Sequence, residues 1–141
     1  MINRKIKILT VVGTRPEIIR LSEIIKKLEK YFDHYLVHTN QNHDLNLKDI
    51  FFQELNIKPY KVLNNIFNNP IESISNTLVQ IDNIIKFLKP DAFLVLGDTN
   101  SSLSSIAAKR NKIPIFHIEA GNRCFNQNVP EEINRKIVDH I

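Results

Sequence analysis

Short apolar runs alternate along this chain with longer segments of helical periodicity, and this alternation restricts its fold more than any other feature. The first run, residues 6–12 (IKILTVV), is nearly all apolar, as expected for a strand that is covered on both faces. The alternation indicates parallel strands with helices on both faces of the sheet, a Rossmann-like α/β fold. The predicted strands are 6–12, 34–39, 60–63, 92–96 and 113–118, and the predicted helices are 16–31, 45–55, 71–88, 101–109 and one that begins near Pro130.

The bulk properties are those of a soluble globular protein with one domain. The chain has 141 residues, of which 43% are hydrophobic and 24% are charged, and no apolar run is long enough to span a membrane. The basic N-terminus lacks the cleavage site of a signal peptide, so we expect a cytoplasmic protein. The net charge of +4 is spread thinly, which argues against nucleic acid as a partner. The single cysteine, Cys124, excludes an intramolecular disulfide and a cysteine-based zinc site.

The three glycines of the chain occupy corresponding positions. Gly13, Gly97 and Gly121 each follow an apolar strand directly or after a few residues. In a parallel sheet these positions are the carboxyl ends of the strands, where open α/β folds bind their ligands. Any one glycine could serve only its own turn, but three of them at one edge predict a rim of ligand-binding loops.

The first of these loops combines Gly13, Thr14 and Arg15 with the start of a helix. Thr14 and Glu17 have the spacing of a capping box, which could be their whole role. Arg15 at a helix N-terminus also suits a phosphate group, because the backbone donors and the helix dipole favour anions there. The patterns GxGxxG and GxxxxGK[ST] are both absent, so neither an NAD site nor an NTPase is predicted.

Three carboxylates belong to the other two loops. Asp98 directly follows Gly97 and could simply cap the next helix. Glu119 stands at the end of an apolar strand, where a buried carboxylate needs a partner or a function. Glu131 follows Pro130 at the positive end of a helix. Several carboxylates in one crevice can divide into an acid and a base, so the cluster favours proton-transfer chemistry on a phosphorylated small molecule.

The last helix also has a purely structural interpretation. Glu131 with Arg135, and Glu132 with Lys136, are spaced as ion pairs on an exposed helix. On this interpretation, substitutions of Glu131 and Glu132 have equally small effects. On the functional interpretation, Glu131 takes part in proton transfer and Glu132 contributes only an exposed pair.

Four segments resemble, in order and spacing, the motifs of the non-hydrolysing UDP-N-acetylglucosamine 2-epimerases: VVGTRPEIIRL, LVLGDTNSS, HIEAGNR and VPEEINR. The resemblance covers essentially the whole chain and is closest to the branch that acts on UDP-2-acetamido-2,6-dideoxy sugars on the route to N-acetyl-L-fucosamine. It implies two Rossmann-like domains arranged as in GT-B glycosyltransferases, with the active site between them. The resemblance implies that residues 1–141 are the N-terminal domain and that the C-terminal UDP-binding domain is not part of this sequence.

The resemblance also implies a reaction. Such an epimerase removes the proton at sugar C2, expels UDP from C1, and then adds UDP back while C2 is protonated on its opposite face. The resemblance implies that Asp98, Glu119 and Glu131 are the acid/base carboxylates. It implies no metal and no cofactor. Substrate binding is implied for Gly13, Thr14, Arg15 and Arg20, with Arg20 in the place of a family lysine.

The absent domain would supply most uridine and diphosphate contacts and a catalytic histidine, which the five histidines here do not match by motif. We therefore expect an incomplete protein that is inactive alone, either a fragment or one half of a split gene with a separately encoded C-terminal half. The alternative is a Rossmann-like module that binds nucleotide sugar weakly or not at all and catalyses nothing. The family implies a homodimer for the intact enzyme. Residues 41–43 fall near a loop that meets a regulatory nucleotide sugar in relatives, but no such site is predicted here.

Overall fold

Five parallel strands form the centre of the protein. The structure, a computed structural model, describes residues 4–41 and 45–141, so two residues of the segment 41–43 lie outside the described residues. The strands are β1 (Lys7–Val12), β2 (Asp33–His38), β3 (Lys61–Val62), β4 (Ala92–Leu96) and β5 (Ile115–Ile118). They form one sheet in the order β3-β2-β1-β4-β5, and every neighbouring pair is parallel.

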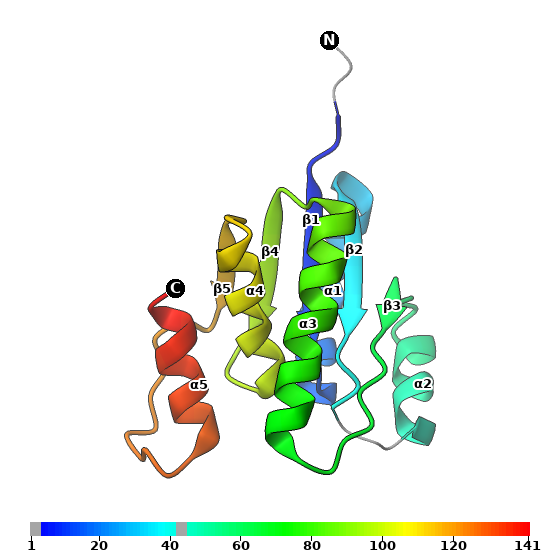
Figure 1. Ribbon diagram of the computed structural model, residues 1–141. Helices are drawn as coiled ribbons and strands as arrows, with labels where there is room; N and C mark the ends of the chain where they lie inside the picture. The colour runs from blue at the N-terminus through cyan, green and yellow to red at the C-terminus, as the bar shows by residue number, and fades with distance from the viewer. Residues whose placement is uncertain (1–3, 42–44) are drawn as a thin grey trace.

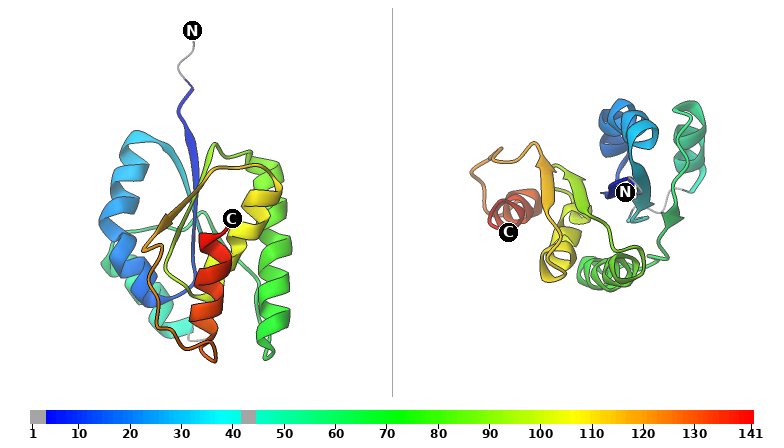
Figure 2. Two further views of the ribbon diagram at one scale, coloured as in Figure 1. Left: turned by 90° about the vertical axis from the view of Figure 1, so that its left-hand side faces the viewer. Right: turned by 90° about the horizontal axis from the view of Figure 1, so that it is seen from above.

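Helices cover both faces of this sheet, which confirms the predicted α/β layers. The helices are α1 (Arg15–Tyr31), α2 (Leu45–Glu54), α3 (Pro70–Leu88), the 3-10 helix η1 (Asn100–Ser104), α4 (Ser105–Arg110) and α5 (Pro130–Asp139). α1 and α2 lie on one face, and α3 and α4 lie on the other, with α5 beside β5 (Figure 1, Figure 2). None of the helices in the described part of the chain is long and apolar enough to cross a membrane.

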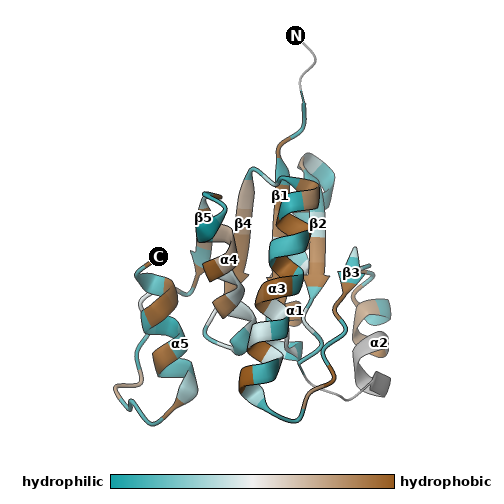
Figure 3. Cartoon of the chain, viewed as in Figure 1, coloured by the Kyte–Doolittle hydropathy of each residue, from teal (hydrophilic) through white to brown (hydrophobic). Residues whose placement is uncertain are grey.

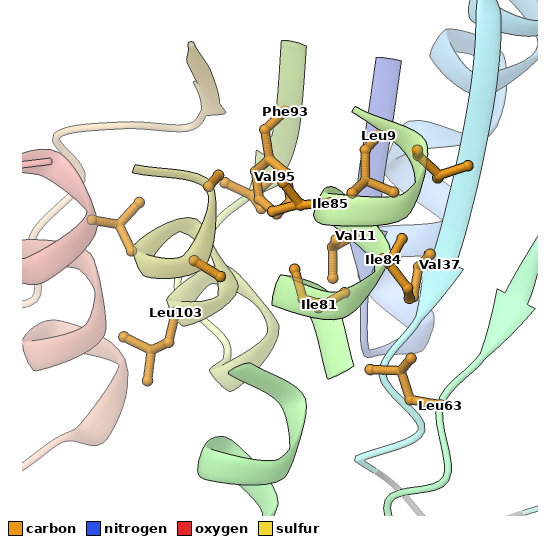
Figure 4. Packing of buried hydrophobic residues seen from close by; sticks show 14 residues of the cluster. Leu9, Val11, Val37, Leu63, Ile81, Ile84, Ile85, Phe93, Val95 and Leu103 are labelled. Carbon is orange, nitrogen blue, oxygen red and sulfur yellow. The ribbon is translucent and has the colours of Figure 1, made fainter. Parts of the chain in front are cut away.

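Two apolar clusters join the layers, one on each face of the sheet. In β1, Leu9 and Val11 enter the cluster with α3 and α4, whereas Val12 enters the cluster with α1. This alternation explains why the strand is apolar on both faces. Figure 3 shows the mostly apolar central strands. Figure 4 shows the larger cluster, in which the labelled residues are Leu9, Val11, Val37, Leu63, Ile81, Ile84, Ile85, Phe93, Val95 and Leu103.

The predicted helix 101–109 begins differently from the prediction. Its first part is η1, and only Ser105–Arg110 is α-helical. The hydroxyls of Ser102 and Ser104 donate to the carbonyls of Thr99 and Ser101, at 2.7 Å and 2.5 Å. Such local side-chain bonds compete with the α-helical pattern, so this serine-rich segment forms a tighter turn first. The predicted strand at 60–63 is also shorter, since only Lys61–Val62 pairs with β2.

The three glycines lie at the same edge of the sheet, as predicted. Gly13 follows β1, Gly97 follows β4 and Gly121 follows β5, and parallel strands bring these ends together. Gly97 and Gly121 have φ angles of 74° and 82°, which favour glycine. Gly13 is required for a different reason: a Cβ atom there would lie 2.5 Å from Oγ1 of Thr39.

Candidate active site

Asp98 forms an ion pair with a buried arginine of the last helix. Its Oδ2 lies 2.6 Å from Nη2 of Arg135, whose side chain is 5% exposed while that of Asp98 is 32% exposed. Nδ2 of Asn134 donates to the carbonyl of Asp98 at 2.9 Å. The N-cap of the following 3-10 helix is Thr99. The interpretation of Asp98 as a helix cap is therefore wrong, and its carboxylate instead holds α5 against the end of β4.

Glu119 has the partner that its position required. Nη1 of Arg20, in α1, lies 2.7 Å from Oε1 of Glu119. Nη1 of Arg135 donates to the Glu119 carbonyl, so Arg135 contacts both the Asp98 loop and the Glu119 loop. Glu119 itself has a φ angle of 64°, in the left-handed region that non-glycine residues rarely adopt. Backbone strain of this kind is often found at functional sites.

Glu131 is exposed in the first turn of α5 and borders two cavities. With Asp98 and Arg135 it lines a cavity of about 380 Å³. It also lines a neighbouring cavity of about 640 Å³ that reaches Thr14 at the start of α1. The fold therefore brings Asp98 and Glu131 to one cavity, and Arg135 connects this cavity to Glu119. Glu131 lies between Asp98 and Thr14 of the first rim loop, because it borders both cavities.

Glu132 differs from the prediction of an exposed ion pair. Its side chain is buried, and its Oε2 accepts a hydrogen bond from the backbone nitrogen of Cys124 at 2.9 Å. The predicted pair with Lys136 is present, at 3.5 Å. The hydrogen bond from Cys124, with help from Lys136, lowers the pKa of Glu132. The predicted pair of Glu131 with Arg135 is replaced by the buried pair of Arg135 with Asp98.

The backbone donors of the first rim loop are bonded to the carboxylate of Glu17. Oε2 of Glu17 accepts hydrogen bonds from the backbone nitrogens of Gly13 and Thr14, at 2.9 Å and 2.6 Å, and the predicted capping box is present. These two donors are engaged within the protein, so a ligand would meet other atoms of Gly13 and Thr14. Arg15 is exposed, and its guanidinium lies 3.8 Å above the ring of Phe51 in α2.

Glu17 also connects two loops. It is only 2% exposed, and its Oε1 accepts from the hydroxyls of Ser101 and Thr99, at 2.5 Å and 3.2 Å. Burial raises the pKa of Glu17, against the lowering effect of these hydrogen bonds. Glu17 was predicted only as part of a cap, and nothing local in the sequence indicates its contact with residues more than 80 positions later.

A second polar cluster fixes the loop after β5. Nε2 of His117 lies 2.6 Å from the carbonyl oxygen of Gly97, and its Nδ1 lies 3.1 Å from Oδ1 of Asp139. Oδ2 of Asp139 accepts from Arg123 at 2.7 Å and from the backbone of Gly121 at 3.0 Å. These donors lower the pKa of Asp139 and outweigh the opposing effect of its burial. The cluster ties the end of α5 to the β5 edge of the site.

The polar face of α5 is buried, which its sequence pattern does not predict. This helix buries Glu132, Asn134 and Arg135, while Ile133 and Ile137 are 47% and 39% exposed. Apolar periodicity predicts the opposite arrangement, since it assigns apolar residues to the buried face. The one signal in the sequence that could indicate this buried polar face is the group of polar residues around Glu132 at the start of a short helix.

The site offers carboxylates next to cations, which suits proton transfer coupled to loss of an anion. Two candidate acids have arginine partners, and the third, Glu131, borders the cavity. Among the described residues, no group of three His, Cys, Asp or Glu side chains is placed to hold a metal ion.

Comparison with known proteins decides the family. A sequence model for UDP-N-acetylglucosamine 2-epimerase matches residues 26–141 of this chain. The chain belongs to the UDP-N-acetylglucosamine 2-epimerase family. The epimerase-family chain is 44% identical over 138 residues to UDP-N-acetylglucosamine 2-epimerase from Methanocaldococcus jannaschii, with 96% of this chain and 38% of the relative aligned. It is 40% identical over 139 residues to UDP-2,3-diacetamido-2,3-dideoxy-D-glucuronate 2-epimerase from Pseudomonas aeruginosa, with 96% of this chain and 39% of the relative aligned.

Solved structures agree with the fold of this epimerase-family chain. The structure of UDP-N-acetylglucosamine 2-epimerase from Rickettsia bellii matches with a TM-score of 0.90 and 52% identity, over 98% of this chain and 37% of that one. The Methanocaldococcus jannaschii enzyme in complex with UDP-GlcNAc and UDP matches with a TM-score of 0.90 and 43% identity, over 96% of this chain and 38% of that one. These matches confirm the Rossmann-like fold expected for one part of a GT-B-type protein. The chain spans less than two fifths of the length of the relatives it matches.

Proposed function

We propose that this chain carries the proton-transfer groups of a UDP-sugar 2-epimerase, an isomerase that inverts C2 of a UDP-2-acetamido sugar by eliminating and re-adding UDP. The observation that carries the proposal is the cluster at the carboxyl edge of the sheet. There Asp98 and Glu131 line one cavity, and Arg135 connects Asp98 to the backbone carbonyl of Glu119. Membership of the epimerase family supports the same assignment. Residues 1–141 then form the N-terminal Rossmann-like domain.

The reaction needs two proton-transfer groups. One carboxylate takes the proton from C2 while the C1–O bond to UDP breaks, which leaves a C1=C2 double bond and the UDP anion. In the second half, a protonated carboxyl on the other face of the sugar delivers a proton to C2, and the phosphate oxygen of UDP bonds to C1 again. Asp98, Glu119 and Glu131 are the groups assigned to these transfers.

The leaving diphosphate needs positive charge nearby. Arg15 and Arg20 are the cations that α1 supplies at this edge, and both side chains are exposed. Arg20 already contacts Glu119, so a diphosphate bound by Arg20 would lie close to a proton-transfer group. Preorganised cations of this kind stabilise charge that develops as the bond breaks. Gly13 and Thr14 would border the same ligand through atoms other than their engaged amides.

The substrate class follows from the relatives. One acts on UDP-N-acetylglucosamine by name, and another acts on a UDP-diacetamido-dideoxy sugar. For this chain we propose a UDP-2-acetamido sugar, with a 2,6-dideoxy sugar as the specific expectation from its motifs. The product would serve as a precursor of surface polysaccharide, made in the cytoplasm.

The relatives contain a large segment beyond the part that this chain matches. We propose that such a segment, in the same or a separate polypeptide, supplies the remaining nucleotide contacts, and that the complete enzyme is a homodimer. The second candidate function is a module that binds nucleotide sugar without catalysis. It is favoured only if the proton-transfer groups prove irrelevant in a complete protein.

A fusion protein tests the proposal. Residues 1–141 are joined to the part of the Methanocaldococcus jannaschii epimerase that lies beyond the matched region, and UDP-N-acetylglucosamine is followed by ¹H NMR. We expect its C2 epimer to form, and we expect a matched fusion with Asp98→Asn and Glu131→Gln to fold but form none. A fusion that unfolds cooperatively and binds UDP, yet produces no epimer, would contradict catalysis and favour the binding module.

A further inference from the structure

We propose that Glu17 is a positioning residue that joins the first rim loop, at the start of α1, to the Asp98 loop after β4. Its hydrogen bonds with Gly13, Thr14, Thr99 and Ser101 are called the loop brace below. The inference rests on the proposed function, because it assigns the first loop to the diphosphate at C1 and the second loop to the proton at C2. It goes beyond the capping role that the sequence indicates for Glu17.

The loop brace consists of one carboxylate with donors from both loops. Oε2 accepts from the backbone of Gly13 and Thr14, at 2.9 Å and 2.6 Å. Oε1 accepts from the hydroxyl of Ser101 at 2.5 Å and from that of Thr99 at 3.2 Å. A carboxylate can accept all of these bonds because both of its oxygens are acceptors. A glutamine would place an N–H group where the carboxylate has an acceptor, so either the two backbone donors lose their acceptor or the two hydroxyls must accept instead of donate.

Capping alone does not require this arrangement. α3 begins with Asn69, whose side chain accepts from the backbone of Ile71 at 2.8 Å in an exposed position. Glu17, in contrast, is 2% exposed, and its partner Ser101 is fully buried. Burying a carboxylate is costly unless its hydrogen bonds are satisfied. The burial is therefore explained by the connection between loops rather than by the cap.

The connection matters because each step of the proposed reaction changes bonds at two adjacent carbons, C1 and C2. The first loop carries Arg15 toward the leaving diphosphate at C1, and the second carries Asp98 toward the proton at C2. If the loops shift relative to each other, each can still bind its part of the substrate, but the reacting groups lose alignment. Misplacement by about 1 Å can slow a reaction roughly a hundredfold. The loop brace should thus affect kcat more than KM.

Ser101→Ala is the direct test, with Ser104→Ala as a matched control. Both serines are fully buried in η1, but Ser104 donates only to the carbonyl of Ser101, at 2.5 Å. In ¹⁵N–¹H spectra of the 141-residue chain, Ser101→Ala is expected to shift the amide signals of Gly13 and Thr14. Ser104→Ala is expected to leave both signals in place. Glu17→Gln should reproduce the shifts.

In the fusion protein, Ser101→Ala is expected to lower kcat roughly tenfold to a hundredfold with little change in KM, and Ser104→Ala to change neither. Unchanged amide signals of Gly13 and Thr14 in Ser101→Ala overturn the connection between the loops. Shifted signals with a normal kcat overturn the positioning role but leave the epimerase function intact. A fusion without turnover before any substitution removes the proposed function and this inference together.

Discussion

At the scale of single residues, charge alternates through the candidate site. Arg20 contacts Glu119, Arg135 contacts the carbonyl of Glu119, and Arg135 also pairs with Asp98. A partly buried carboxylate is stabilised by such a partner, since an unpaired charge would lose its hydration without compensation. Glu131 differs, because it is exposed and borders the cavities at the first turn of a helix. Glu131 thus differs from the other two candidate acids, whose carboxylates are paired with Arg20 and Arg135.

Glu131→Gln and Glu132→Gln should have opposite effects in the fusion protein. Glu131 is exposed, so its substitution should leave the melting temperature unchanged and lower kcat by roughly two to four orders of magnitude. Glu132 accepts from the backbone of Cys124, so its substitution should lower the melting temperature. Thermal unfolding and kcat are measured side by side. Equal, small effects of the two variants would instead support a purely structural role for both acids.

His34 should make the stability of the chain depend on pH. Nε2 of His34 lies 2.8 Å from Oγ1 of Thr10, and burial lowers the pKa of His34 from 6.5 to about 4. Between pH 6.5 and 4 the unfolded chain binds a proton at His34 that the folded chain does not. The free energy of unfolding should therefore decrease as the pH falls from 6.5 to 4, and His34 should not affect its pH dependence above 6.5. The slope is at most about 1.4 kcal/mol per pH unit.

Urea unfolding at several pH values measures this dependence. His34→Gln should flatten the stability curve between pH 6.5 and 4, whereas His140→Gln, at an exposed position, should not. Parallel curves for the original chain and His34→Gln would show that His34 is not the group responsible.

At the scale of secondary structure elements, α5 is attached to the domain by polar contacts of Asn134 and Arg135 as well as by Val138 in the larger apolar cluster. Arg135→Met should destabilise the chain by roughly 2 kcal/mol, because Asp98 and the carbonyl of Glu119 lose a buried donor. Lys136→Met is the control: its side chain is 41% exposed and its ion pair with Glu132 is long, so its loss should cost roughly a few tenths of a kcal/mol. Chemical denaturation compares the two. Equal losses would show that polar contacts of Arg135 do not dock α5.

The elements of the sheet were predictable because their signals are local. Apolar runs such as residues 6–12 identify strands, and Gly13, Gly97 and Gly121 identify the edge that carries the loops. The polar face of α5 was not predictable in this way. Arg135 is buried because Asp98, 37 positions earlier in the sequence, offers it a charge, and only the folded chain brings them together.

At the scale of the whole molecule, the arginines that border the cavity are engaged within the domain, Arg135 with Asp98 and Arg123 with Asp139. Arg15 and Arg20 are the arginines of the first rim loop and α1, and Arg20 is engaged with Glu119. The relatives include a further segment of more than half their length. We therefore expect the 141-residue chain alone to show no epimerisation of UDP-N-acetylglucosamine at rates typical of enzymes, because the leaving UDP lacks much of its electrostatic stabilisation. Turnover by the purified chain, followed by ¹H NMR, would contradict this expectation.

Exchange of the C2 proton with solvent is the most direct test of proton transfer at this edge of the sheet. The fusion protein is incubated with UDP-N-acetylglucosamine in heavy water, and deuterium at C2 is measured by NMR and mass spectrometry. We predict one deuterium at C2 in the epimer, and strongly slowed incorporation after Glu131→Gln. An epimer that retains the original C2 hydrogen, or exchange at the original rate in both Asp98→Asn and Glu131→Gln, would contradict proton transfer by these carboxylates.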